Sequence, residues 1–332
     1  MTEIAKRPGA IATLRNATGN GKGDATTASD GGPSLPAGPD REFTVKARSQ
    51  GQMVFRRFLR HRIAIVSLVL LLLVALGAFI IPIFWKYSYR TILPTAESNA
   101  HPSWKHPFGT DTIGHDMLAQ TLRGAQKSLE IAALVAVAST FIGVVVGAVA
   151  GYFRGWTDAV LMRFTDLVLT IPALAIAATL GFQIHGSGNS LLIAVVLTLT
   201  FWMSTARIIR GEFLSLREKE FVEAARASGA SDGRIIFKHI LPNVVGPMIV
   251  SATLAVAAAI LTETALSFVG AGVKDPDTSL GLLVATNQRA FRTRPWLFWY
   301  PGLLIIIIAL TINFIGDGLR DAFDPKQTRV RA

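Results

Sequence analysis

Ionisable residues are rare inside the apolar segments of this chain, and they are the first candidates for chemistry. The four are Glu130, Arg163, Asp166 and Glu263. A charge near the centre of a membrane-spanning helix costs about 2.5–3.5 kcal/mol, and less near the helix ends. Arg163 and Asp166 are three residues apart, so we expect them to form an ion pair that fixes their helix. Glu130 and Glu263 lie near predicted helix ends, where they either reach water or line a transport pathway.

Signatures of catalysis are not found among these residues. The metalloprotease pattern HExxH is absent, and the run Gly19–Gly23 lacks the GxxxxGK[ST] spacing of a phosphate loop. The chain has no cysteine, which excludes disulfides and cysteine-ligated metal sites. We therefore predict that the chain is not an enzyme and carries no catalytic residue, no cofactor and no metal site.

The composition identifies the medium in which the chain lies. Of its 332 residues, 51% are hydrophobic and 17% are charged, whereas soluble domains carry about 25% charged residues. The net charge of +11 does not indicate a nucleic-acid partner, because cytoplasmic loops and contacts with membrane lipid produce the same basic excess. We predict an all-α, multi-pass protein of the cell membrane.

Six apolar segments are long enough to cross a membrane. About 20 helical residues, each rising about 1.5 Å, span a hydrocarbon core of about 30 Å. The predicted transmembrane helices cover residues 63–84, 128–151, 159–183, 190–206, 244–270 and 301–317. Pro172 interrupts the third of them and predicts a kink.

The first 62 residues divide into two parts. Residues 1–50 are rich in Gly, Ser, Thr, Pro and Ala, which predicts a disordered tail. Residues 51–62 can place four apolar side chains on one helical face among several arginines. This pattern predicts either an amphipathic helix in the membrane interface or a basic flank of the first span.

The positive-inside rule orients the chain. Of the 33 Lys and Arg residues, 24 lie in the segments 1–62, 152–163, 207–243 and 320–332. These segments are therefore predicted to face the cytoplasm, with both termini and the tail 321–332 inside. The loops 85–127 and 270–300 are predicted to be extracytoplasmic.

A ladder of glycines lies in the second span. Gly143, Gly147 and Gly151 follow one another at a period of four residues. Small residues at this spacing let helix backbones approach closely in lipid. We expect this ladder to pack against another helix, and it carries no information about a substrate.

One polar segment, Glu223–Pro242, interrupts the apolar part of the chain on the cytoplasmic side. A short helix is predicted to end at Gly229. A second helix, capped by Ser231 or Asp232, is predicted to end at Pro242 and to present its apolar side chains as a small knob edged by charges. From the residues alone, this knob either docks in a groove of another protein or rests on lipid headgroups.

These residues resemble a known family. Glu223-Ala224-Ala225, Gly229 and Leu241-Pro242 look like the EAA motif of ABC importer permeases, and His239 is similar to the peptide and nickel branch. Further resemblances to this branch are His106–Asp111 with Gly114 and Asp116, Met162–Phe164 with Asp166 and Pro172, Glu263–Gly270, Gly316–Asp317, Leu319–Asp321 and Asp324–Pro325. His115 and Leu280 depart from the usual Arg and Trp. The resemblance covers residues 52–326 and is strongest to the C-type permease subunit of dipeptide and oligopeptide importers.

The resemblance implies the type I ABC importer permease fold, with a five-helix core in residues 128–320. It implies half of a peptide pathway, formed with a sister permease in a heterodimer. Two ATP-binding subunits would drive it with ATP and Mg, and an extracytoplasmic solute-binding protein would deliver the substrate. The residues that it assigns to ATPase coupling, within the loop 207–243, are Glu223, Ala224, Ala225, Arg226, Gly229, Ala230, His239, Leu241 and Pro242.

The loop before the last span holds candidates for contact with the solute-binding protein. They are Arg289, Arg292, Arg294 and Trp296. These arginines either steer an acidic face of that protein or pair within the chain with Asp275 or Asp277.

Two alternative functions are open at this point. The same machinery would import nickel or another small solute if its binding protein selected that cargo. A stand-alone secondary transporter or channel is a more distant alternative. It would need inverted repeats and a chain of polar residues through the spans, and the sequence shows no convincing sign of either.

Overall fold

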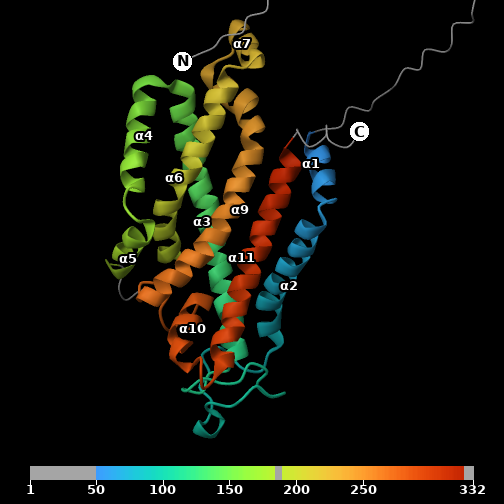
Figure 1. Ribbon diagram of the computed structural model, residues 1–332, viewed down its shortest axis with the longest axis vertical. Helices are drawn as coiled ribbons and strands as arrows, with labels where there is room; N and C mark the ends of the chain where they lie inside the picture. The colour runs from blue at the N-terminus through green and yellow to red at the C-terminus, as the bar shows by residue number, and fades with distance from the viewer. Residues whose placement is uncertain (1–49, 184–188, 325–332) are drawn as a thin grey trace, which may run out of the picture. The chain divides into compact units, whose positions relative to one another are not determined.

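The computed structural model describes residues 50–183 and 189–324, and every regular element in these ranges is helical (Figure 1). The longer helices are α1 Gln50–Phe58, α2 Arg62–Phe84, α3 Met117–Phe153, α4 Gly155–Leu169, α5 Ala173–Gln183, α6 Ser190–Arg217, α7 Glu220–Ala227, α9 Leu241–Val269, α10 Leu280–Asn287 and α11 Pro295–Phe323. A short α8, Asp232–Arg234, and a π-helical turn, Ile235–Ile240, precede α9. The predicted tail 1–50, apart from its last residue, and residues 325–332 lie outside the described residues.

Among the described residues, five helical segments are long and apolar enough to cross a membrane, and the pair α4–α5 makes a sixth span if its halves count together. α2 covers the predicted first span. Three others are clearly longer than predicted. α3 begins at Met117 rather than residue 128, α6 continues to Arg217 rather than residue 206, and α11 runs from Pro295 to Phe323 rather than from residue 301 to 317. In Figure 1, α1 and α7 lie toward one end of the long helices, which is called the α7 end. The loop 85–116 and α10 lie toward the opposite end, which is called the α10 end.

The third predicted span is not one kinked helix. α4 and α5 meet at an angle of 80° across a break of a few residues that contains Pro172. Proline has no N–H and its ring clashes with the preceding turn, which favours a break of the helix at this point. The carbonyl of Pro172 instead accepts hydrogen bonds from Ala175 N–H at 2.9 Å and Ile176 N–H at 3.2 Å, and so begins α5.

Pro242 does not end a helix, contrary to the expectation. The chain is helical from Asp232 to Val269 and passes Ile235–Ile240 as a π-helical turn. Pro242 lies at the start of α9, directly after the π-helical turn, so the chain accommodates its missing N–H without leaving the helix. The charged segment is therefore joined to a transmembrane helix without a flexible link.

The glycine ladder of α3 faces α6. A Cβ on Gly143 would lie 2.7 Å from Thr205 Cβ, and a Cβ on Gly151 would lie 2.7 Å from Phe213 Cβ. At Gly147 the same atom would lie 2.5 Å from the carbonyl oxygen of Ala206. No other residue type fits these three positions at this helix separation, which is the packing expected of small residues in lipid.

α1 packs beside the ends of α2 and α11. Phe58 and Ala64 are buried against Ile315 and Ala322. The guanidinium of Arg57 donates to the carbonyl oxygen of Ala322 at 3.5 Å. α1 is therefore a separate helix fixed at the α7 end, and not an extension of α2.

Replacing Gly147 by alanine should weaken the α3–α6 contact, because its Cβ would overlap the Ala206 carbonyl and overpacking costs about 1–3 kcal/mol. We expect a lower thermal midpoint of the purified protein in detergent. Gly211→Ala, on an exposed face of α6 with no neighbouring atom within 4 Å, is the control and should not lower the midpoint. Equal midpoints for the two variants would contradict the close contact.

Candidate functional sites

The charged segment turns sharply after α7. Gly229 has φ of +77°, its N–H donates to Arg226 O at 3.0 Å, and Ala230 N–H donates to Ala225 O at 3.0 Å. These two hydrogen bonds define a Schellman motif, whose left-handed position favours glycine. Among the described residues, no atom beyond the turn itself lies within 4 Å of a Cβ built on Gly229. The space beside the turn is therefore open.

One side of the segment is internal. Val222, Ile235 and Ile240 have no exposed surface and pack with Ile209 and Phe213 of α6. This corrects the expected knob, because only part of the apolar surface is available to a partner.

The other side of the segment is exposed. Phe237 is 70% exposed and Phe221 is 42% exposed. Of the predicted coupling residues, Glu223, Ala224, Arg226, Gly229 and Pro242 are exposed, and Ala225, Ala230, His239 and Leu241 are half-buried.

Polar contacts tie the segment to the α3–α4 turn. Tyr152 Oη donates to Asp232 Oδ1 at 2.6 Å. Arg154 donates to Glu218 Oε1 at 2.5 Å, and this hydrogen bond lowers the pKa of Glu218 below its ordinary value. Arg217 donates to the carbonyl oxygen of Tyr152. At the α7 end, these hydrogen bonds thus connect helices that are distant in sequence.

One catalytic string does occur in the chain, contrary to the expectation from the sequence. The run Gly229–Gly233 matches the GxSxG string of serine hydrolases. In those enzymes the serine follows a strand and precedes a helix. Ser231 instead lies between two helices, and its side chain forms no capping hydrogen bond. The string therefore does not indicate a nucleophile here.

Two ion pairs join α4 to α6. Asp158 accepts two hydrogen bonds from Arg210, at 2.5 and 2.6 Å, and Asp166 accepts one from Arg207. The expected pair between Arg163 and Asp166 is therefore wrong. Arg163 is exposed and has no ion-pair partner within 50–183 and 189–324.

Glu263 does not reach water, so this one of its two expected positions is wrong, and the expectation that it lines a pathway stays a prediction. Its side chain is only 1% exposed. Ser279 Oγ donates to Glu263 Oε1 at 2.6 Å, Ser267 Oγ donates to the same oxygen at 2.9 Å, and Ser128 Oγ reaches Oε2 at 3.4 Å. The cluster joins α3, α9 and the start of α10. The sequence offered no sign that these three serines would meet.

Comparison with known proteins identifies the family. Residues 143–329 match the family described as binding-protein-dependent transport system inner membrane component, and residues 49–102 match the N-terminal TM domain of oligopeptide transport permease C. The chain is 44% identical over 286 residues to the oligopeptide transport system permease protein OppC of Mycobacterium tuberculosis, which covers 85% of this chain and 97% of that protein. This chain belongs to the binding-protein-dependent transport permeases.

Other relatives agree with this assignment. The permease is 36% identical over 290 residues to OppC of Bacillus subtilis, covering 87% of this chain and 94% of that protein. Its fold is similar to a chain of the MetNI methionine ABC transporter in an inward-facing conformation, with a TM-score of 0.52 and 21% identity over 63% of this chain and 98% of that chain. The permease therefore has the type I ABC importer permease fold.

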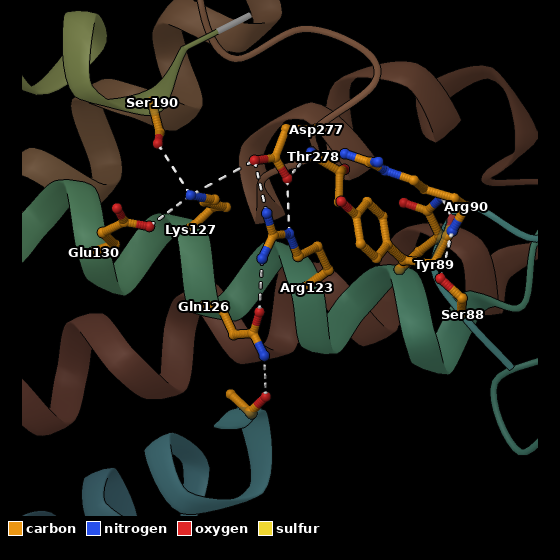
Figure 2. A network of polar contacts seen from close by, with 12 residues as sticks. Ser88, Tyr89, Arg90, Arg123, Gln126, Lys127, Glu130, Ser190, Asp277 and Thr278 are labelled. Carbon is orange, nitrogen blue, oxygen red and sulfur yellow. Dashed lines mark hydrogen bonds and ion pairs between the residues drawn. The ribbon is translucent and has the colours of Figure 1, made fainter. Parts of the chain in front are cut away.

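A polar network lies at the α10 end of the permease (Figure 2). Arg123 donates two hydrogen bonds to Asp277, at 2.8 and 3.0 Å, and Lys127 Nζ lies 3.6 Å from Asp277 Oδ2. Burial raises the pKa of Asp277, but the hydrogen bonds from Arg123 and Thr278 N–H and the charges of the two cations outweigh it and lower the pKa below the ordinary 3.8. Asp277 is therefore deprotonated at neutral pH and paired with Arg123 and Lys127.

The same network reaches two further helices. Gln126 donates to the carbonyl oxygen of Ala78 in α2 at 2.8 Å. Lys127 donates to Ser190 Oγ at the start of α6 at 3.3 Å and to Glu130 at 2.7 Å. Glu130 is 46% exposed and paired, which is compatible with either of its expected roles.

The loop 85–116 is held by the signature that precedes α3. Asp111 Oδ1 accepts from Gly114 N–H at 2.7 Å and from His115 N–H at 2.7 Å. Asp116 caps α3, and its Oδ2 lies 2.7 Å from Nδ1 of the buried His106. His115, which replaces the usual arginine, lies 2.9 Å from Asp111 Oδ2 through Nδ1. The two carboxylates organise the loop.

The three arginines between α10 and α11 do not pair with Asp275 or Asp277 among the residues that the structure describes. Arg289, Arg292 and Arg294 have no ion-pair partner in the described part of the chain. Arg289 and Arg292 are exposed and Arg294 is half-buried. The expected intrachain pairing therefore does not occur there.

Trp296 does not share this exposed surface. It is half-buried, its ring centroid lies 4.5 Å from that of His101, and Gly109 packs against its indole. Trp104, on the loop 85–116, is instead fully exposed. Sequence reasoning missed Trp104, although an aromatic residue within a polar loop was a usable signal.

Proposed function

We propose that this chain is the permease subunit of an ATP-driven importer of peptides. It forms half of the transmembrane pathway with a sister permease and receives peptides from a solute-binding protein. The observation that carries the proposal is the exposed turn at Gly229, held by a Schellman motif and joined directly to a transmembrane helix. The names of the relatives, oligopeptide transport system permeases, support a peptide cargo.

The turn after α7 is proposed to seat in a groove of an ATP-binding subunit. Ala224 and Gly229 permit close approach, while Glu223 and Arg226 supply charge at the rim. Two such subunits would hydrolyse ATP with Mg, which agrees with the absence of a phosphate-loop motif from this sequence. Coupling requires that this contact differ in free energy between inward-facing and outward-facing states. The contacts of Tyr152 and Arg154 would transmit the movement to α3 and α4.

The α7 end is proposed to face the cytoplasm, with both termini on that side of the plasma membrane. The distribution of Lys and Arg supports this orientation. The α10 end would then meet the solute-binding protein through Arg289, Arg292 and the exposed Trp104.

The direct test is uptake by the complex reconstituted with its sister permease, ATP-binding subunits and solute-binding protein. We expect ATP-dependent accumulation of labelled peptides from a panel of dipeptides and oligopeptides, with background accumulation when ATP is withheld. The length at which uptake is strongest would separate dipeptide from oligopeptide import. Uptake of a nickel complex without peptide uptake would support the alternative cargo, and uptake by this chain alone would support a secondary transporter or channel.

Replacing Gly229 by asparagine tests the coupling turn without straining it. Asparagine tolerates the left-handed conformation and would place its side chain in the open space beside the turn. We expect normal membrane insertion and thermal stability, with at least tenfold weaker binding of the ATP-binding subunits, equivalent to about 1.4 kcal/mol, and loss of uptake.

Gly270→Asn is the matched control, because Gly270 also has positive φ, of +84°, and also has no atom within 4 Å of its Cβ position. It lies outside the coupling segment and should leave uptake unchanged. Normal assembly and uptake in Gly229→Asn would sink the docking proposal.

Charge reversal at Arg289 and Arg292 tests the opposite surface. The double variant should slow association of the solute-binding protein several-fold at low salt, and the difference should fade at high salt as charges are screened. Lys86→Glu, at an exposed site on the loop 85–116, controls for a general change in charge. Unchanged association in the double variant, or an equal effect of Lys86→Glu, would count against this surface.

A further inference from the structure

An apolar groove runs between α2 and α11 at the α7 end. Its volume is about 420 Å³. It is lined by Arg62, Ile63, Val66, Ser67, Leu70, Ile307, Leu310, Thr311 and Phe314. Thr311 Oγ1 donates to the carbonyl oxygen of Ile307 at 2.7 Å, so its hydroxyl is already satisfied. The groove therefore offers a hydrocarbon surface along most of its length.

The one charged residue of the groove is Arg62, the first residue of α2. Arg62 is exposed and has no ion-pair partner among residues 50–183 and 189–324. Asp321 of α11 is instead paired with the neighbouring His61, at 3.6 Å. A guanidinium thus stands at the end of the apolar groove where α1 joins α2.

α1 adds further positive charge beside this end. A second hollow, of about 230 Å³, is lined by Gln52, Met53, Arg56, Arg57 and Arg60. Arg57 is engaged with the carbonyl oxygens of α11, whereas Arg56 and Arg60 are exposed and form no ion pair with the described residues. Phe55 and Leu59 of the same segment are 64% and 53% exposed. Exposed apolar and cationic side chains together are typical of a segment in the membrane interface.

We propose that the groove between α2 and α11 binds one acyl chain of an anionic phospholipid, whose phosphate pairs with Arg62. Arg56 and Arg60 strengthen the attraction, since basic side chains near an anionic membrane surface are drawn to it electrostatically. Guanidinium groups bind phosphate oxygens through two parallel hydrogen bonds, and zwitterionic lipids also carry a phosphate. An anionic lipid has in addition a net negative charge, which is attracted by all three arginines. The proposal does not depend on peptide transport.

The bound lipid would support a weakly held helix. Only 17% of the most apolar stretch of α2 is buried inside the chain, whereas 61% of the corresponding stretch of α6 is buried. A lipid seated between α2 and α11 covers apolar surface of both helices at once. The phospholipid would therefore supply apolar contacts to α2 that the described residues of the chain do not supply.

The test is native mass spectrometry of the full chain in detergent with added phosphatidylglycerol or phosphatidylcholine of identical acyl chains. We expect phosphatidylglycerol to bind at least fivefold more tightly. Arg62→Gln should reduce that preference about fivefold, the equivalent of about 1 kcal/mol. Leu310→Trp should fill the groove and weaken the binding of both lipids.

Two matched variants keep the test specific. Leu303→Trp alters an equally exposed position of α11 outside the groove, and Arg292→Gln removes an exposed arginine at the α10 end. Both should bind lipid as the unaltered chain does. Equal binding of the two lipids, or no effect of Arg62→Gln, would overturn the headgroup assignment. If Leu310→Trp bound both lipids as the unaltered chain does, the groove would not be the lipid-binding site. The same result is expected if another protein segment fills the groove.

Discussion

The close approach of α3 and α6 is the contact on which the rest of the permease depends. Three glycines remove the side chains that would otherwise separate the two backbones, so α6 lies against α3 over several turns. At the α7 end of this contact, Val222 and Ile235 pack against Ile209 and Phe213 of α6. The position of the charged segment Glu223–Pro242 is therefore a consequence of helix packing.

Polar side chains between the helices follow a second physical rule. In a medium without water, an uncompensated charge is expensive, so ionisable groups between helices take partners on other elements. Asp158 and Asp166 pair with arginines of α6, Arg123 pairs with Asp277, and the buried Glu263 accepts hydrogen bonds from serines. Each contact joins two elements, so a movement of one helix must carry or break the contact.

The two proposed partner surfaces lie at opposite ends of the same helices. α7 and the turn at Gly229 continue into α9, and α9 leads to Glu263 and the loop that holds Asp277. A change at one end thus has a continuous helical route to the other. The route would serve alternating access only if each partner binds the two states with different affinity.

Local properties of the sequence determined the all-helical membrane class, the extent of α2, the glycine ladder and the turn at Gly229, since hydropathy, small-residue spacing and turn preference act over a few residues. The family resemblance, carried by motifs of the same kind, was also readable. Pro172 indicated an interruption of the third span, and only the structure fixed its angle at 80°. Tertiary structure alone decided the partners of Asp166 and Glu263 and the half-buried position of Trp296. These features depend on which side chain of another helix arrives at a given place. Because that contact joins residues far apart in the chain, no local pattern specifies it.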